Sequence, residues 1–142
     1  MKYKFLEHTA DVKFQAFGSS AEELFENSAL ALKEAICGKI KVKDKIRKKF
    51  IIESPSKDLT EVDYEKMLYS FLEELLYLLD AENFLLNKVK VKIVQKTRLE
   101  AVAVGDKAKN YKFTNSVKAV TYNEMFIKKQ KDKWVSQVVV DV

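Results

Sequence analysis

The chain has few of the residues that interrupt secondary structure or cross-link a fold. Among its 142 residues are three glycines, one proline and one cysteine. No Ser/Gly/Pro-rich linker, repeat or low-complexity segment divides it, so we expect a single domain over residues 1–142. The lone Cys37 excludes an internal disulfide and leaves a zinc site without its usual thiolates. We expect this side chain to be buried at the end of a helix.

Long apolar segments and catalytic signatures are missing as well. No segment approaches the roughly 20 apolar residues of a membrane span, and no apolar run of signal-peptide length follows the basic N-terminus. We therefore expect a soluble cytoplasmic protein with no membrane partner. The sequence contains no glycine-rich phosphate loop, no G-x-S-x-G, no H-E-x-x-H and no paired-cysteine motif. Nucleophilic or nucleotide-dependent catalysis is accordingly not expected.

Positive charge is in excess, with a formal net charge of +5. Lysines near phosphates release counterions, so this charge permits contact with nucleic acid without establishing it. The lysines recur through almost every segment of the sequence instead of clustering, which favours a solvated surface. A nucleic-acid-binding or chaperone-like module that uses the Lys-rich segments 41–49 and 88–96 stays open as an alternative.

Two segments have helical periodicity, and the others alternate in the manner of short strands. Ser20 and Glu23 have the spacing of a capping box and predict a helix that ends at Gly38. A second helix is predicted over residues 63–79, with a wide apolar face of the kind that packs on a sheet. This order predicts an α+β fold with two helices packed on mostly antiparallel β-sheet. The predicted strands are residues 2–5, 12–18, 41–53 (ending at the Ser54-Pro55 break), 89–94, 99–104, 116–122, 125–129 and 134–140.

The candidate metal ligands are acidic residues near the two ends of the chain. Asp11 precedes a predicted strand, and Asp141 follows the last one. If the first and last strands lie close together, the two carboxylates converge, and a hard divalent cation would relieve their repulsion. Asp11, Asp141 and a main-chain or terminal oxygen of Val142, with water, would form a partly open calcium-type shell. The alternative is that Asp11 is a turn former and Asp141 a solvated terminal residue.

The only histidine, His8, cannot build a multi-histidine metal centre. A lone histidine next to an acidic residue, here Glu7, is more often a hydrogen-bonded structural residue than a general base. A metal-dependent hydrolase would need a base and an open coordination position near the ion. With only these two side chains nearby, hydrolysis is the least favoured interpretation.

Five segments of the sequence stand out as motifs: E-H-T-A-D-V at 7–12, A-E-E-L-F-E-N at 21–27, F-L-E-E-L-L at 71–76, V-K-A-V-T-Y at 117–122 and the terminal Asp141-Val142. In order and spacing these motifs resemble the archease family over essentially the full chain. The resemblance implies a non-catalytic protein that binds calcium or a similar divalent ion and activates a GTP-dependent RNA ligase in tRNA splicing and RNA repair. Such a protein promotes guanylylation of the ligase and its multiple turnover, and meets tRNA or other RNA indirectly through the ligase.

The resemblance also implies roles for individual residues. Asp11, Asp141 and Val142 would form the metal shell, while Lys118 and His8 would be functional or partner-contacting residues. From the residues alone, Lys118 is an exposed lysine on a strand. The chain departs from the family pattern at two positions, with Asn123 where a histidine is common and Lys13 where a glycine is common.

Overall fold

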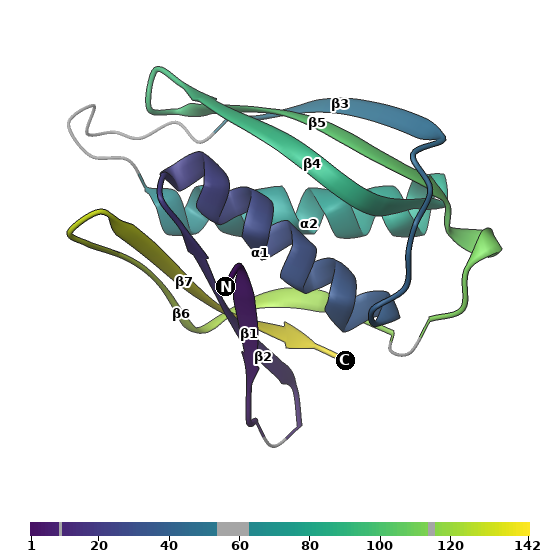
Figure 1. Cartoon of the computed structure of the whole chain (residues 1–142), viewed down its shortest axis with the longest axis horizontal. Helices are drawn as coiled ribbons and strands as arrows, with labels where there is room; N and C mark the ends of the chain where they lie inside the picture. The colour runs from purple at the N-terminus through teal and green to yellow at the C-terminus, as the bar shows by residue number, and fades with distance from the viewer. Residues whose placement is uncertain (9, 54–62, 114–115) are drawn as a thin grey trace.

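The computed structural model describes residues 1–8, 10–53, 63–113 and 116–142 (Figure 1). The predicted break at Ser54-Pro55 lies outside these residues. In chain order the elements are β1 (Tyr3–Leu6), β2 (Val12–Gly18), α1 (Ala21–Cys37), β3 (Ile46–Glu53), α2 (Tyr64–Glu82), β4 (Phe84–Val94), β5 (Arg98–Lys107), the short 3-10 helix η1 (Ala108–Asn110), β6 (Ala119–Gln130) and β7 (Lys133–Asp141).

Two antiparallel sheets enclose the two helices. One sheet has the strand order β1-β2-β7-β6 and the other has the order β3-β5-β4. Figure 1 shows α1 and α2 lying side by side between the sheets, so the molecule has three layers. The predicted α+β fold with two helices on antiparallel sheet is confirmed. Within the described ranges, neither helix has the length and apolarity needed to cross a membrane.

Helix α1 begins and ends where its sequence predicts. The Ser20 hydroxyl accepts a hydrogen bond from the Glu23 N–H at 3.1 Å, and the Glu23 carboxylate accepts one from the Ser19 N–H at 3.0 Å. Gly38 ends the helix with a φ of 73°, a conformation that glycine adopts without strain. Cys37, at the end of the helix, is buried as expected.

Helix α2 continues three residues beyond its predicted end. It runs to Glu82 because Asn83 takes the left-handed conformation, with φ 54° and ψ 36°, and serves as the C-cap that the sequence pattern did not identify. Phe71 of α2 packs between Phe25 of α1 and Phe50 of β3, with ring centroids 5.8 and 6.0 Å apart. These rings join both helices to the three-stranded sheet.

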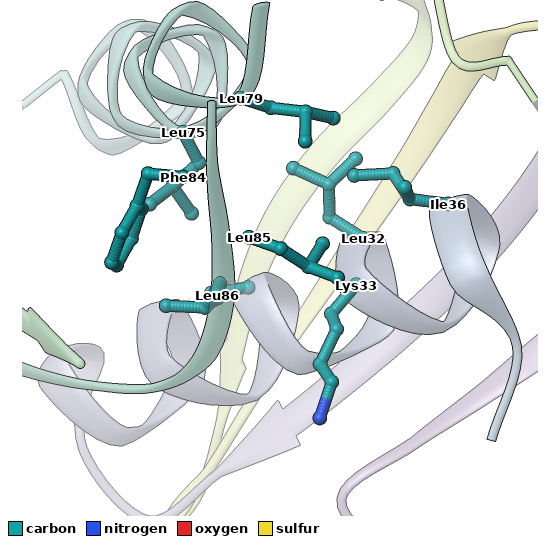
Figure 2. A pocket seen from close by; sticks show the side chains of 9 residues that line it. Leu32, Lys33, Ile36, Leu75, Leu79, Phe84, Leu85 and Leu86 are labelled. Carbon is teal, nitrogen blue, oxygen red and sulfur yellow. The ribbon is translucent and has the colours of Figure 1, made fainter. Parts of the chain in front are cut away.

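The helical layer is closely packed against the three-stranded sheet. A cavity of about 10 Å³ lies between α1, α2 and β4, at the lower limit of the space that one water molecule occupies. Figure 2 shows the leucine side chains that line it, with the amino group of Lys33 pointing away. No ligand fits in this space.

Three strand predictions need correction. The strand predicted over 41–53 begins at Ile46, and β4 begins at Phe84 instead of 89. The early part of β4 is buried on both faces, so it lacks the alternation that marks a half-exposed strand. The segments 116–122 and 125–129 belong to one strand, β6, whose register with β7 shifts between Thr121 and Phe126.

Glutamates of the helices satisfy backbone donors at the edges of both sheets. The Val91 N–H of edge strand β4 donates to the Glu26 carboxylate of α1 at 2.8 Å. The Val120 N–H of edge strand β6 donates to the Glu73 carboxylate of α2 at 2.7 Å. Unpaired edge groups are a liability in a sheet, and these bonds occupy two of them while fixing each helix to a strand.

Replacing Glu26 should therefore test how much one such bond stabilises the fold. We expect Glu26→Ala to lower the free energy of unfolding by about 1–3 kcal/mol, because the Val91 N–H loses a charged acceptor. Glu26→Gln keeps an acceptor oxygen and should lose distinctly less. Urea unfolding of the three proteins measures the difference, and equal stability of the alanine and glutamine variants would contradict a hydrogen-bonding role.

Candidate metal and partner-binding site

The candidate site lies at the end of the four-stranded sheet where β2, β7 and β6 come together. Val12 of β2 and Val120 of β6 both pair with Val140 of β7. Asp11 directly precedes Val12, and Asp141 directly follows Val140. Antiparallel pairing therefore brings the two aspartates to the same end of adjacent strands. This is the arrangement expected from the sequence if the first and last strands lie close together. Figure 1 shows the C-terminal end of β7 beside β2.

Both carboxylates are without a basic partner in the part of the chain that the structure describes. Asp141 is exposed, and Asp11 is half-buried. The main-chain oxygen of Asp141 accepts a hydrogen bond from the Lys118 N–H at 2.8 Å. Lys118 is thus held at this end of the sheet through its backbone, while its side chain is exposed and forms no ion pair with Asp141.

Val142 has a different position from the two aspartates. Its side chain is half-buried and packs against the hydrophobic core. An apolar side chain offers no ligand atom, so Val142 can contribute only a main-chain oxygen to a cation. Its packing holds the chain beyond Asp141 against the domain.

His8 is joined to a residue that sequence analysis missed. Its Nε2 lies 3.0 Å from the Glu124 Oε2, and the Lys13 Nζ donates to the Glu124 Oε1 at 3.3 Å. The other ring nitrogen of His8, Nδ1, is buried without a hydrogen-bond partner among the described residues. The expectation of a hydrogen-bonded His8 thus agrees with the structure, and its partner is Glu124.

Glu124 reaches this cluster because β6 is irregular. The residue has a φ of 56°, and it lies within the segment where the β6–β7 register shifts. Its main-chain oxygen accepts from the Gln137 Nε2 at 2.9 Å, and Gln137 in turn accepts from the Gln15 side chain at 2.9 Å. The only signal in the sequence is a polar pair, Asn123 and Glu124, between two alternating segments, and it was interpreted as a gap between strands.

The cluster favours the ionised form of Glu124. Hydrogen bonds from His8 and then Lys13, together with the lysine charge, hold the pKa of this carboxyl below its ordinary value of 4.5. A carboxylate whose folded pKa is depressed adds stability above its unfolded pKa, and this stability is lost as pH falls through the folded value. The Glu124 interactions should therefore stabilise the protein near neutral pH and fade under acid conditions.

Glu124→Gln tests this dependence. The variant should be less stable than the parent protein at about pH 7, and the difference should shrink as the pH falls through the depressed pKa of Glu124. Urea unfolding over a series of decreasing pH values measures it. Asp132→Asn, in the exposed turn before β7, is the control. A stability difference that stays constant with pH would show that ionisation of Glu124 is irrelevant.

His8 and Asp11 share a surface cleft that Asp141 does not line. The cleft has a volume of about 460 Å³ and lies between the β1–β2 connection and the C-terminal end of α1. Glu34, Gly38 and Lys39 close its opposite side. The candidate residues therefore lie in two parts of one end of the four-stranded sheet, here named the rim: His8 and Asp11 at this cleft, and Asp141 with Lys118 at the end of β7.

The oxygen donors at this rim suit a hard cation, but they provide only part of its coordination shell. No group of three or more His, Cys, Asp or Glu side chains with metal-ligand geometry occurs in the described residues. Asp11 and Asp141 supply carboxylate oxygens, and Val142 can add a main-chain oxygen. Calcium takes six to eight oxygens, so water or another molecule would have to complete the shell.

Comparison with known proteins places the chain in a family. The model of the Archease protein family (MTH1598/TM1083) matches residues 3–142. The chain belongs to the archease family. The archeases of Methanosarcina barkeri and Pyrococcus furiosus are each 37% identical to it over 147 residues, covering 99% of this chain and 96% and 99% of those relatives.

Solved structures agree with the archease assignment. The solution structure of Methanobacterium thermoautotrophicum protein 1598 is 32% identical and superposes with a TM-score of 0.83, covering 99% of both chains. The crystal structure of an archease from Thermotoga maritima, described as a possible chaperone, has a TM-score of 0.66 at 21% identity and covers 98% of this chain and 96% of its own. The latter likeness concerns the fold alone.

The two departures from the family pattern have clear positions in this archease. Lys13 lies in β2, and its amine engages Glu124. Asn123 is exposed, and its N–H donates to the Thr121 hydroxyl at 3.3 Å. Neither residue replaces Asp11 or Asp141, so the two candidate carboxylates are retained.

Proposed function

We propose that this archease is a non-catalytic cytoplasmic protein that binds a divalent cation, by preference calcium, and activates a GTP-dependent RNA-splicing ligase. It promotes guanylylation of the ligase and repeated turnover in tRNA splicing and RNA repair, and meets RNA substrates through the ligase. The observation that carries the proposal is the position of Asp11 and Asp141 at one exposed end of adjacent strands. The resemblance of the motifs to those of archeases supports a ligase as the partner.

The electrostatics of the rim support a cation. Two carboxylates at the same end of adjacent strands repel each other, and no lysine or arginine among the described residues neutralises either one. A divalent ion would remove this repulsion, and oxygen donors favour hard cations such as calcium. The bound ion would supply positive charge and open coordination positions at the surface.

The same rim offers contacts for a protein partner. Lys118 directly precedes β6, its side chain is exposed, and its backbone N–H donates to the Asp141 main-chain oxygen. Its amine would therefore be available near the proposed ion. A cation with an incomplete shell can accept a carboxylate or phosphate oxygen from another molecule. The ion and Lys118 together would then contact the ligase, with His8 at the cleft side of the same rim.

Removal of either aspartate should weaken cation binding. We expect Asp11→Ala and Asp141→Ala each to lower calcium affinity by on the order of tenfold or more, because each removes a charged oxygen ligand. Asp132→Ala is a matched control, since this acid lies at the opposite end of the nine-residue strand β7, roughly 30 Å away at about 3.3 Å per residue. Calorimetric titration measures the affinity, and unchanged binding by both variants would contradict the assignment.

The ligase test uses the same three variants. Parent protein and Asp132→Ala should stimulate guanylylation and multiple turnover of the ligase, while Asp11→Ala and Asp141→Ala should lose most of the stimulation. Circular dichroism confirms that each variant is folded. Full stimulation by both folded variants would eliminate the proposed role of the metal rim.

A further inference from the structure

The outer face of the three-stranded sheet is strongly basic. Residues alternate along each strand, so that Phe50, Val91 and Ala101 face the helices while their neighbours face outward. Figure 1 shows both helices on the inner side of this sheet and no described element over its other side. The outward-facing side chains, here named the basic face, are Arg47, Lys49, Ile51 and Glu53 of β3, Lys88, Lys90, Lys92 and Val94 of β4, and Arg98, Glu100, Val102 and Val104 of β5.

The basic face holds most of the net charge of the chain. It has six basic and two acidic side chains, a net formal charge of +4, whereas the whole chain has +5. The lysines are dispersed in the sequence, but the fold gathers a subset of them on one surface. Five of the six basic residues of this face come from the Lys-rich segments 41–49 and 88–96 that the alternative interpretation of the sequence named.

Strand register arranges the charges in two columns. Arg47 and Lys88 flank Val104, and Lys49 and Lys90 flank Val102. Neighbouring strands lie about 4.8 Å apart, so the columns are separated by roughly 10 Å, and successive lysines in one column by roughly 6.6 Å. A valine strip between two basic columns results, with a surface hollow of about 410 Å³ beside it that Lys49, Ile51 and Val102 line.

Most of these charges have no acidic partner. Lys88 lies 3.5 Å from Asp44, and Arg98 lies 3.3 Å from Glu100. Arg47, Lys49, Lys90 and Lys92 form no ion pair with any described residue. Like charges placed side by side in a sheet repel each other, and a bound polyanion would relieve this repulsion.

We propose that the basic face binds RNA through its phosphates. The choice of RNA among nucleic acids rests on the proposed function, whereas the charge pattern itself is independent of it. No aromatic side chain faces outward here, so stacking on bases is not available and binding should not depend on sequence. A protein partner would be expected to find apolar or aromatic anchors, and Ile51 is the sole exposed large apolar residue of this face.

The position of the basic face allows both surfaces to act together. The face belongs to the three-stranded sheet, while Asp11 and Asp141 lie at the end of the other sheet, across the helical layer. A ligase bound at the metal rim would leave the basic face accessible. The archease would then hold part of the RNA directly, in addition to contact through the ligase.

Binding of labelled RNA to charge-reversed variants tests the inference. For single-stranded RNA, Lys90→Glu/Lys92→Glu should lower affinity on the order of tenfold or more and reduce the salt slope by about 1.4, from two phosphate contacts at about 0.7 each. The single variant Lys49→Glu, on a different strand, should show a smaller loss. The matched control is Lys128→Glu/Lys131→Glu, which makes the same charge change on β6 and the adjoining turn.

Several results would overturn the inference. They are an absence of RNA binding by the parent protein at about 50 mM salt, an unchanged affinity of both folded variants, or an equal loss in the control. Binding of an acidic peptide but not of RNA would also exclude it and indicate a protein partner. Tight binding of DNA and RNA alike would support phosphate contact by the basic face.

The RNA test is separable from the test of the metal rim. Guanylylation of the ligase with GTP can be measured without an RNA substrate, so Lys90→Glu/Lys92→Glu should stimulate it fully. Asp11→Ala should fail in that assay while it still binds RNA with parent affinity. A failure of either proposal alone therefore gives a distinct pattern of results.

Discussion

The position of α1 between two sheets is the constraint on which the rest of the structure depends. This helix is buried on two sides and contacts β2 below and β4 above. Small residues, Ala29, Ala31 and Ala35, are buried in it and allow close approach. Ser28 and Ser136 of β7 hydrogen-bond at 2.9 Å in the core, which fixes the helix over the strand that ends at Asp141. The packing of the core and the geometry of the candidate site are thus linked.

Local features of the fold could be predicted because they are encoded within a few residues. Ser20, Glu23 and Gly38 set the ends of α1 through short-range hydrogen bonds and backbone conformation. The start of β4 at Phe84 could not be predicted in this way, because burial on both faces removes the alternation. The division of the strands between two sheets depends on packing against the helices, and no local pattern specifies it.

The candidate site shows the same division between local and long-range information. Asp11 and Asp141 were found because each carboxylate adjoins a strand, and pairing of β2 with β7 brings them to one end of the sheet. Glu124 was missed because its position depends on the irregularity of β6 against β7. The Lys-rich segments 41–49 and 88–96 were recognised in the sequence, but their arrangement as two columns was not, because Lys49 and Lys90 become neighbours across β5 only through strand register.

The helical layer separates two surfaces of opposite electrostatic character. The end of β7 presents acidic groups without basic partners, which favour a cation, and the basic face presents amines without acidic partners, which favour a polyanion. On each surface, side chains of like charge repel one another, and most of them have no partner of opposite charge among the described residues. Such groups destabilise the fold, so both surfaces are typical of binding sites. The two surfaces belong to different sheets, so each one is assembled by its own strand register.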